Sequence, residues 1–331
     1  MNMAEWLPVA FLALMGTSML VYVVLDGYDL GVGMLLPRAD ALERDTMIAS
    51  IGPFWDANET WLVLGVGILL IAFPRAHGMV LGALYLPVAL MLVGLVLRGV
   101  AFDFRVKAQD RWKPLWNRAF FAGSLMAAAS QGWMLGRYVT GLQDTWMSTA
   151  FAAVIALLLP AAYVLLGACW LVIKTEGALQ RRAVGWARAA WPAVALGMAL
   201  ISLATPLVSE TVRARWFAMP ELIALLPIPL VTVAALLGAR AMLEPRTAES
   251  RWCWVPFALV VLVFVLGALG LAYSLFPFVV IDRLTIWEAA SATEALQVIA
   301  IGCVLTVPVI AGYTVFSYRV FRGKASPLDY A

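Results

Sequence analysis

Four carboxylates near the start of the chain have a spacing and a setting that suit proton transfer. Asp26 and Asp29 are three residues apart and follow twenty uncharged residues, and Asp56 and Glu59 repeat this spacing at the start of the next apolar segment. Residues three apart share one face of a helix. Ionisable groups at membrane depth are costly and tend to mark ion or proton routes. We therefore take these four residues as candidates for a proton path.

A basic residue accompanies these carboxylates. Arg98 lies at the end of a further apolar segment, and Asp103 follows it in the sequence. Arg98 and Asp103 are candidates for a structural ion pair, because a buried charge needs a partner. The residues also admit a purely structural interpretation, in which the carboxylates only tie helices to Arg98 or contact water at the lipid headgroups.

Neither a catalytic residue nor a metal site is expected in this chain, and the sequence names no cofactor-binding residue. The single histidine, His77, lies in a short turn after Pro74, and we expect it to be an ordinary residue at the membrane–water interface. The three cysteines, Cys169, Cys253 and Cys303, show no C-x-x-C spacing, so packing explains them best.

The composition is that of an integral membrane protein. Hydrophobic residues make up 63% of the chain, charged residues 13%, and the mean hydropathy is +0.90, whereas soluble domains carry about 25% charged residues. The polar breaks are short, so we expect residues 1–331 to form a single membrane domain. The net charge is only +3, and the basic residues are spread over several turns, which suggests contacts with lipid headgroups and does not imply a nucleic-acid partner.

Nine segments are apolar and long enough to cross a bilayer, which takes about 20 helical residues. Eight are uncharged, and the second one begins with the turns that carry Asp56 and Glu59. The segments are 6–25, 53–73, 78–97, 119–136, 145–173, 189–209, 222–239, 252–281 and 295–318. The sequence therefore predicts an all-α integral membrane protein with nine transmembrane helices.

The distribution of lysine and arginine predicts the orientation. Connections that follow odd-numbered segments hold 17 basic residues, those on the other side hold five, and Arg98 lies inside a segment. The positive-inside rule then places the N-terminus in the periplasm and the C-terminus in the cytoplasm of a bacterial inner membrane. All four candidate carboxylates fall on the cytoplasmic side, where they can meet in one polar cluster.

Three motifs together resemble subunit II of cytochrome bd quinol oxidases. They stand in the order of that family: Asp26-Gly27-Tyr28-Asp29-Leu30-Gly31-Val32-Gly33-Met34-Leu35, then Trp55-Asp56-Ala57-Asn58-Glu59-Thr60-Trp61-Leu62, then Arg98-Gly99-Val100-Ala101-Phe102-Asp103-Phe104-Arg105. The resemblance continues through 112–124, Gln131-Gly132, Phe276-Pro277 and 287–291. It therefore spans the whole chain.

The resemblance implies a fold, a partner and a role for one residue. The fold would be two four-helix bundles, residues 1–140 and 145–281, with a peripheral ninth helix at 294–321. The partner would be a haem-bearing subunit I in a heterodimer, with haems b and d or b alone, which oxidises quinol and reduces dioxygen to water. Asp56 matches the carboxylate that begins a proton path from the cytoplasm. A bound quinone, lipids and a small accessory membrane subunit are further expectations.

Two other functions stay open from the residues alone. A proton-coupled secondary transporter would use the same carboxylates, but it predicts a binding cavity near the midplane of the bilayer. A purely structural membrane scaffold would use them only as ion pairs. Copurification of a haem-bearing partner of similar size would separate an oxidase subunit from a transporter.

Overall fold

Helices make up nearly all of the chain that the computed structural model describes, which comprises residues 3–208, 210–219 and 221–325. The helices are α1 (Met3–Leu35), a 3-10 turn (Leu36–Arg38), α2 (Ala41–Ala49), α3 (Trp55–Ala72), α4 (Pro74–Lys107), α5 (Lys113–Val139), α6 (Trp146–Lys174), α7 (Gly177–Val208), α8 (Glu210–Phe217), α9 (Glu221–Leu225), α10 (Pro227–Met242), α11 (Pro245–Ala248), α12 (Val255–Leu275), α13 (Ile286–Ala289) and α14 (Thr293–Val320). A short antiparallel pair, β1 (Phe278–Val280) and β2 (Leu284–Thr285), precedes α13.

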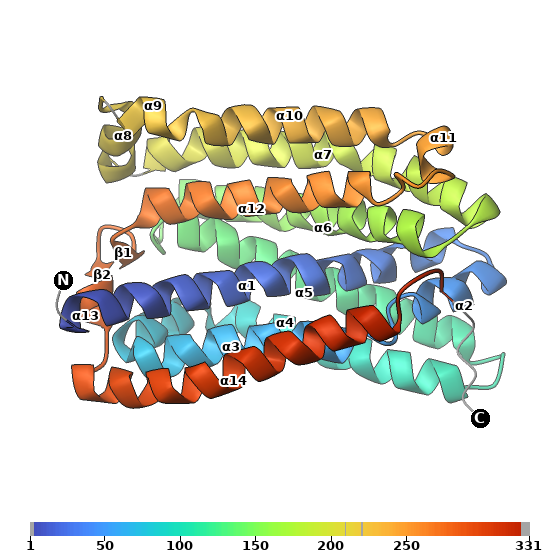
Figure 1. Cartoon of the computed structure of the whole chain (residues 1–331), viewed down its shortest axis with the longest axis horizontal. Coiled ribbons are helices and arrows are strands. Elements are labelled where there is room, and N and C mark those ends of the chain that lie inside the picture. The colour runs from blue at the N-terminus through green and yellow to red at the C-terminus, as the bar shows by residue number, and fades with distance from the viewer. Residues whose placement is uncertain (1–2, 209, 220, 326–331) are drawn as a thin grey trace.

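The long helices lie side by side along the longest axis of the molecule (Figure 1). Among the described residues, seven helices are long and apolar enough to cross a membrane: α1 (continued to Arg38), α3, α4, α6, α7, α12 and α14. The expected class, an all-α multi-pass membrane protein, is therefore confirmed.

The two remaining expected segments do not meet this criterion, so the number of nine crossings stays a prediction. The helix α5 carries more polar side chains, and α10 has only 16 residues. The seventh segment breaks into α9 and α10 before Pro227, because proline lacks a backbone N–H and clashes with the preceding turn. The last residue of the sixth segment, Ser209, lies outside the described residues.

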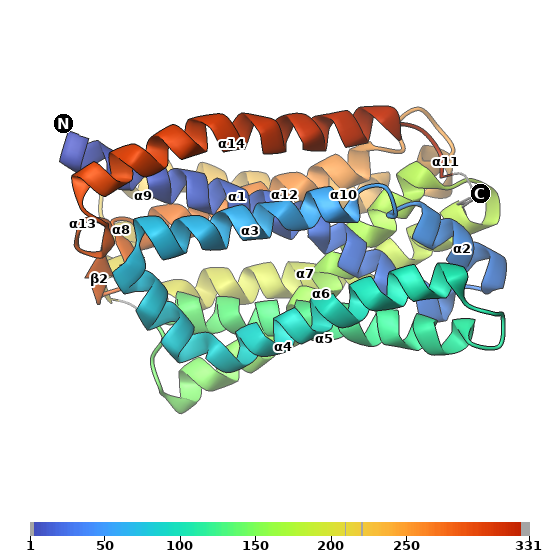
Figure 2. The same cartoon turned by 90° about the horizontal axis from the view of Figure 1, so that it is seen from below.

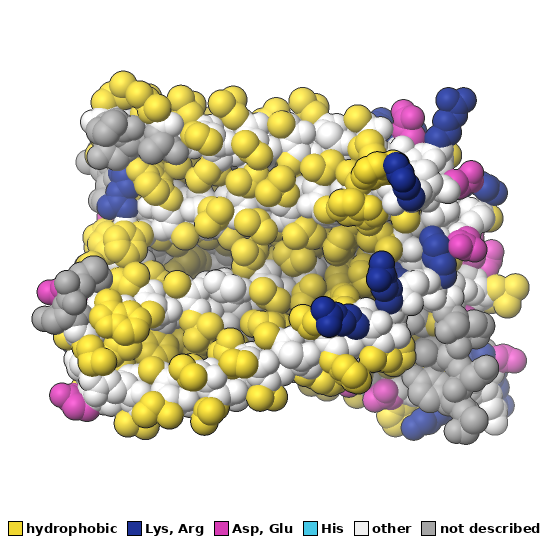
Figure 3. Space-filling model, viewed as in Figure 1, with side chains coloured by type: hydrophobic (Ala, Val, Ile, Leu, Met, Phe, Trp, Pro, Cys, Tyr) yellow, Lys and Arg dark blue, Asp and Glu magenta, His cyan; other side chains and the backbone are white. Residues whose placement is uncertain are grey.

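Apolar side chains cover the flanks of the helix array (Figure 3). Val304 on α14 and Tyr85 on α4 are each 71% exposed, as expected for side chains that face lipid tails. In the view of Figure 3, lysines and arginines gather chiefly at the end where α2 and α11 lie. The start of α1 and the end of α14 lie at opposite ends of the molecule (Figure 1).

The helices α1 and α6 cross at glycines that allow their backbones to touch. A Cβ atom at Gly31 would lie 1.8 Å from the carbonyl oxygen of Tyr163, and one at Gly167 would lie 2.5 Å from the backbone nitrogen of Val32. Small residues are common where membrane helices approach closely. The crossing encloses the part of α1 that carries Asp26 and Asp29. At the edge of the array, α14 packs on α1 and α3 (Figure 2).

Replacing Gly31 with alanine should weaken the crossing of α1 and α6, because the new methyl group would overlap the Tyr163 carbonyl oxygen. We expect the free energy of unfolding to fall by about 1–3 kcal/mol. The measurement is the thermal unfolding temperature in mild detergent, which should be lower. Gly16→Ala is the control, because it lies in the same helix and its Cβ would meet nothing within 4 Å. Equal stability of the two variants would contradict the prediction.

Candidate functional site

Arg98 on α4 lies at the centre of a buried cluster of charged side chains. Its Nη1 atom lies 2.7 Å from Oδ1 of Asp26 on α1, and the guanidinium forms a second ion pair with Glu59 on α3. Arg98 is 1% exposed and Asp26 fully buried, whereas the side chain of Glu59 is 29% exposed. Arg98 thus ties three helices together and joins a buried carboxylate to a half-buried one.

Asp29 lies one turn beyond Asp26 and has a different set of partners. Its Oδ2 atom accepts a hydrogen bond from Nδ2 of Asn58 at 2.8 Å. The same Asn58 nitrogen lies 3.0 Å from the Tyr28 hydroxyl, and its Oδ1 atom accepts a hydrogen bond from the Tyr318 hydroxyl at 3.1 Å. The two tyrosine hydroxyls are 2.5 Å apart. Asn58 therefore connects α1, α3 and α14 around Asp29.

Asp56 and Asp103 are exposed beside this cluster. Asp56 lies in the first turn of α3, where the charges of both Asp103 and Arg98 act on it. The side chains Asp56, Glu59 and Asp26 therefore lead from the surface to the interior. In the described chain, the ion pairs of Arg98 are formed with Asp26 and Glu59, and the expected pair with Asp103 is not formed. Asp103 lies five positions after Arg98, which turns the two side chains about 140° apart on α4.

The cluster contains more carboxylates than it has positive charges to compensate them. Asp26, Asp29 and Glu59 face a single guanidinium, that of Arg98. Both carboxylate oxygens of Asp26, Oδ1 of Asp29, and Nε and Nη1 of Arg98 are buried without a hydrogen bond of standard geometry, although Asp26 and Arg98 are within ion-pair distance. Buried polar atoms of this kind are normally satisfied by water. The arrangement is thus suited to bind water and to exchange protons.

Several polar partners of the cluster were not predicted from the sequence. Gln131 on α5 donates a hydrogen bond from Nε2 to the Tyr22 hydroxyl at 2.9 Å, and the Tyr163 hydroxyl on α6 donates to Oε1 of Gln131 at 2.5 Å. Gln131 and Asn58 were identifiable in principle, because uncharged polar side chains inside apolar helices often bond to neighbouring helices. Tyr22 and Tyr163 could not be recognised as partners in this way, because tyrosine is also common at membrane–water interfaces.

The residues considered as metal or haem ligands lie apart from one another. Among the described residues, no three histidine, cysteine, aspartate or glutamate side chains are arranged to hold a metal ion. His77 is half-buried in the first turn of α4. Cys169 is buried, Cys253 and Cys303 are half-buried, and all three are free thiols.

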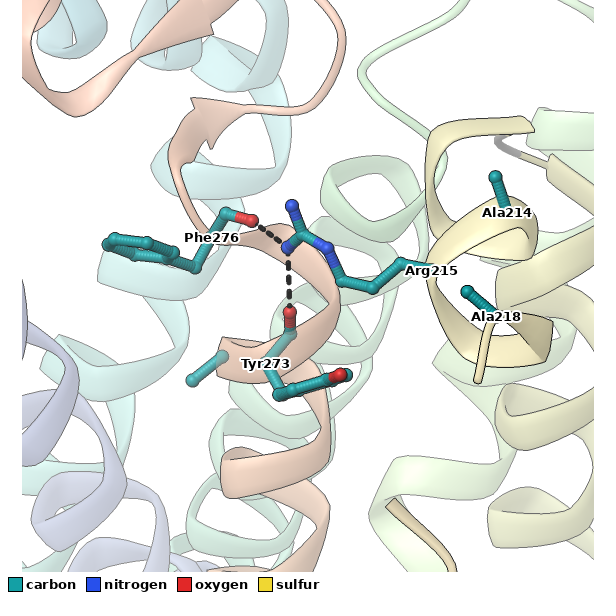
Figure 4. A pocket seen from close by; sticks show the side chains of 6 residues that line it. Ala214, Arg215, Ala218, Tyr273 and Phe276 are labelled. Atoms are coloured by element: carbon teal, nitrogen blue, oxygen red, sulfur yellow. Dashed lines mark hydrogen bonds between the residues drawn. The ribbon is translucent and has the colours of Figure 1, made fainter. Parts of the chain in front are cut away.

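A cavity of about 660 Å³ lies between α8 and the end of α12 (Figure 4). None of the predicted site residues lines it; the lining residues are Ala214, Arg215, Ala218, Ala272, Tyr273 and Phe276. Arg215 donates hydrogen bonds to the carbonyl oxygens of Tyr273, at 3.2 Å, and Phe276. These bonds satisfy carbonyl groups at the C-terminal end of α12, which is a structural role.

The helical fold and its buried charges define a multi-pass membrane protein that holds an arginine–carboxylate cluster inside the helix array. The family model of cytochrome bd terminal oxidase subunit II matches residues 7–321. The chain therefore belongs to this family, and the resemblance seen in its motifs is confirmed.

Similar proteins are matched over nearly their whole length. The cytochrome bd ubiquinol oxidase subunit 2 of Bacillus subtilis is 29% identical, with 93% of this chain and 95% of the relative covered. The cytochrome bd-I ubiquinol oxidase subunit 2 of Escherichia coli K12 is also 29% identical, with 96% and 94% covered. A chain in the structure of bd oxidase from Geobacillus thermodenitrificans shares the fold, with a TM-score of 0.78 at 15% identity over 96% of this chain and 98% of that one.

Replacing Arg98 with methionine should destabilise the protein, because Asp26 and Glu59 would lose their compensating charge. Removing one partner of a buried ion pair costs about 3–5 kcal/mol. We expect a lower unfolding temperature, and partial recovery when Asp26→Asn is added. Lys107→Met is the control, since Lys107 is exposed on the same helix. An Arg98→Met protein as stable as this control would contradict the assigned ion pairs.

Proposed function

We propose that this chain is the haem-free subunit of a bd-type quinol oxidase and that its carboxylates take up protons from the cytoplasm. As a subunit of a quinol:oxygen oxidoreductase, it acts in a complex that oxidises quinol and reduces dioxygen to water. The proton role rests mainly on one observation, the sequence of exposed Asp56, half-buried Glu59 and buried Asp26 around Arg98. Dioxygen reduction consumes protons, and carboxylates with bound water conduct them inside membrane proteins.

The haems are assigned to the partner subunit I. A haem iron needs axial ligands in a prepared pocket, and this chain contains a single histidine, His77, at the start of α4. The heterodimer, haems b and d or b alone in subunit I, a bound quinone, lipids and a small accessory subunit follow from the family. The described residues support no particular quinone site.

We also infer nine crossings, with a periplasmic N-terminus and a cytoplasmic C-terminus. The opposite positions of the start of α1 and the end of α14 support an odd number of crossings (Figure 1). The gathering of lysine and arginine at one end supports the orientation. The division into bundles at residues 1–140 and 145–281, with a ninth helix at 294–321, belongs to the same proposal.

The two alternative functions are not favoured. The family match does not support a secondary transporter, and the carboxylates lie near one end of the helix array and not at its middle, where transporters bind substrate. A purely structural scaffold needs the charges of the cluster but not its exchangeable protons. A substitution that keeps the shape of a carboxylate and removes its proton therefore distinguishes a scaffold from a relay.

Asp56→Asn should lower quinol-driven oxygen consumption by about tenfold or more while haem content and assembly stay normal, because the first proton acceptor is lost. The measurement is oxygen uptake by the purified two-subunit complex, with haem quantified by its absorbance. Asp110→Asn is the control, because Asp110 is an exposed carboxylate in the connection after α4. Reduced haem content would instead indicate a structural role, and unchanged turnover would reject the relay.

A topology reporter should confirm the orientation. A reporter that is active only outside the cytoplasm should be silent when fused after Ala331 and active when fused after Leu142, in the connection between α5 and α6. The basis is the excess of lysine and arginine on the other side of the membrane. A complementary reporter that is active only in the cytoplasm should give the opposite result, and reversal of both patterns would refute the orientation.

A further inference from the structure

A line of hydrogen-bonded side chains from α5 and α6 ends next to the cluster. The Tyr163 hydroxyl donates to Oε1 of Gln131 at 2.5 Å, and Nε2 of Gln131 donates to the Tyr22 hydroxyl at 2.9 Å. Tyr22 lies one helical turn before Asp26 on the same face of α1, where the charge of Asp26 acts on its hydroxyl group, although no hydrogen bond of standard geometry joins the two side chains. The line thus runs from α6 through α5 to Tyr22 on α1, one turn from the buried carboxylate of Asp26.

We propose that Tyr22, Gln131 and Tyr163 are positioning residues, which hold the Asp26 carboxylate in the orientation that proton transfer requires. This inference rests on the proposed proton uptake and adds α5 and α6 to the elements that control it. The path from Asp56 through Glu59 does not itself need these three side chains, so their connected arrangement calls for a separate explanation.

The direction of the hydrogen bonds supports this role. Because the Tyr22 oxygen accepts the N–H of Gln131, the hydroxyl proton of Tyr22 is free to point toward Asp26. Tyr163, Gln131 and Tyr22 then all donate in one direction, and hydrogen bonds aligned in this way strengthen one another. The donor proposed for Asp26 is therefore neutral, whereas the Arg98 guanidinium, whose Nη1 atom lies 2.7 Å from Oδ1 of Asp26, is charged.

Burial makes the line rigid. Tyr163 is fully buried, Tyr22 is 1% exposed and Gln131 is 8% exposed. A Cβ atom at Gly27 would lie 2.8 Å from the Tyr163 ring, so this ring packs directly on α1 next to Asp26. A buried amide or hydroxyl is costly without its partner, and the three side chains therefore favour one connected arrangement.

The test uses the two-subunit complex and three substitutions. Gln131→Leu breaks the line in the middle, Tyr163→Phe removes only its last hydroxyl, and Tyr138→Phe is the control. Tyr138 donates its hydroxyl to the carbonyl oxygen of Val279, outside the cluster. Quinol-driven oxygen consumption and redox-induced infrared difference spectra are measured at matched haem content. Asp26→Asn identifies the infrared band of the Asp26 carboxyl group.

We expect Gln131→Leu to lower turnover by about two- to tenfold, the range that one lost hydrogen bond supports. It should also shift the Asp26 band, because a carboxyl group that loses a donor changes its stretching frequency. Tyr163→Phe should shift the band less and in the same direction, while Tyr138→Phe should leave turnover and band unchanged.

An unshifted Asp26 band in Gln131→Leu would overturn the positioning role whatever Asp56→Asn does. If Gln131→Leu fails to assemble, Tyr163→Phe decides in its place, because it deletes a single oxygen atom, and an unshifted band there has the same meaning. Normal turnover in Asp56→Asn together with a shifted band in Gln131→Leu would reject the proton path through Asp56 and support the positioning of Asp26.

Discussion

The burial of Arg98 between Asp26 and Glu59 is the interaction on which the rest of the structure depends. A lone guanidinium inside an apolar helix array is costly, and so is a lone carboxylate. Each therefore requires the other, and α1, α3 and α4 must meet where these side chains lie. The glycines at the crossing of α1 and α6 then set how closely the surrounding helices enclose Asp26.

The features that depend on composition and spacing were predictable from the sequence. Apolar segments located the helices, and the spacing of Asp26 and Asp29, like that of Asp56 and Glu59, indicated shared helix faces. The partner of Arg98 was not fixed in this way, because an ion pair between helices depends on the rotation of each helix about its axis. Asp103 is the nearest carboxylate in the sequence, yet it lies on another face of α4, and Arg98 pairs with residues of α1 and α3.

Contacts made by uncharged polar side chains were the least predictable part of the site. Gln131, Tyr163 and Tyr318 come from three different helices, α5, α6 and α14, and none carries a charge that would require a partner. Their role depends on which helix faces meet, and a single sequence does not record this. Burial explains their importance, since polar groups without water must satisfy one another.

The hydrogen bond between Asn58 and Tyr318 joins residues that are 260 positions apart. During synthesis from the N-terminus, α1 and α3 are made long before α14. Asn58, which bonds to Asp29, therefore lacks its hydrogen bond from Tyr318 during that time. A growing chain therefore carries an incomplete polar site between α1 and α3 until α14 is made. The polar site is complete only when α14 has been made and has packed on α1 and α3.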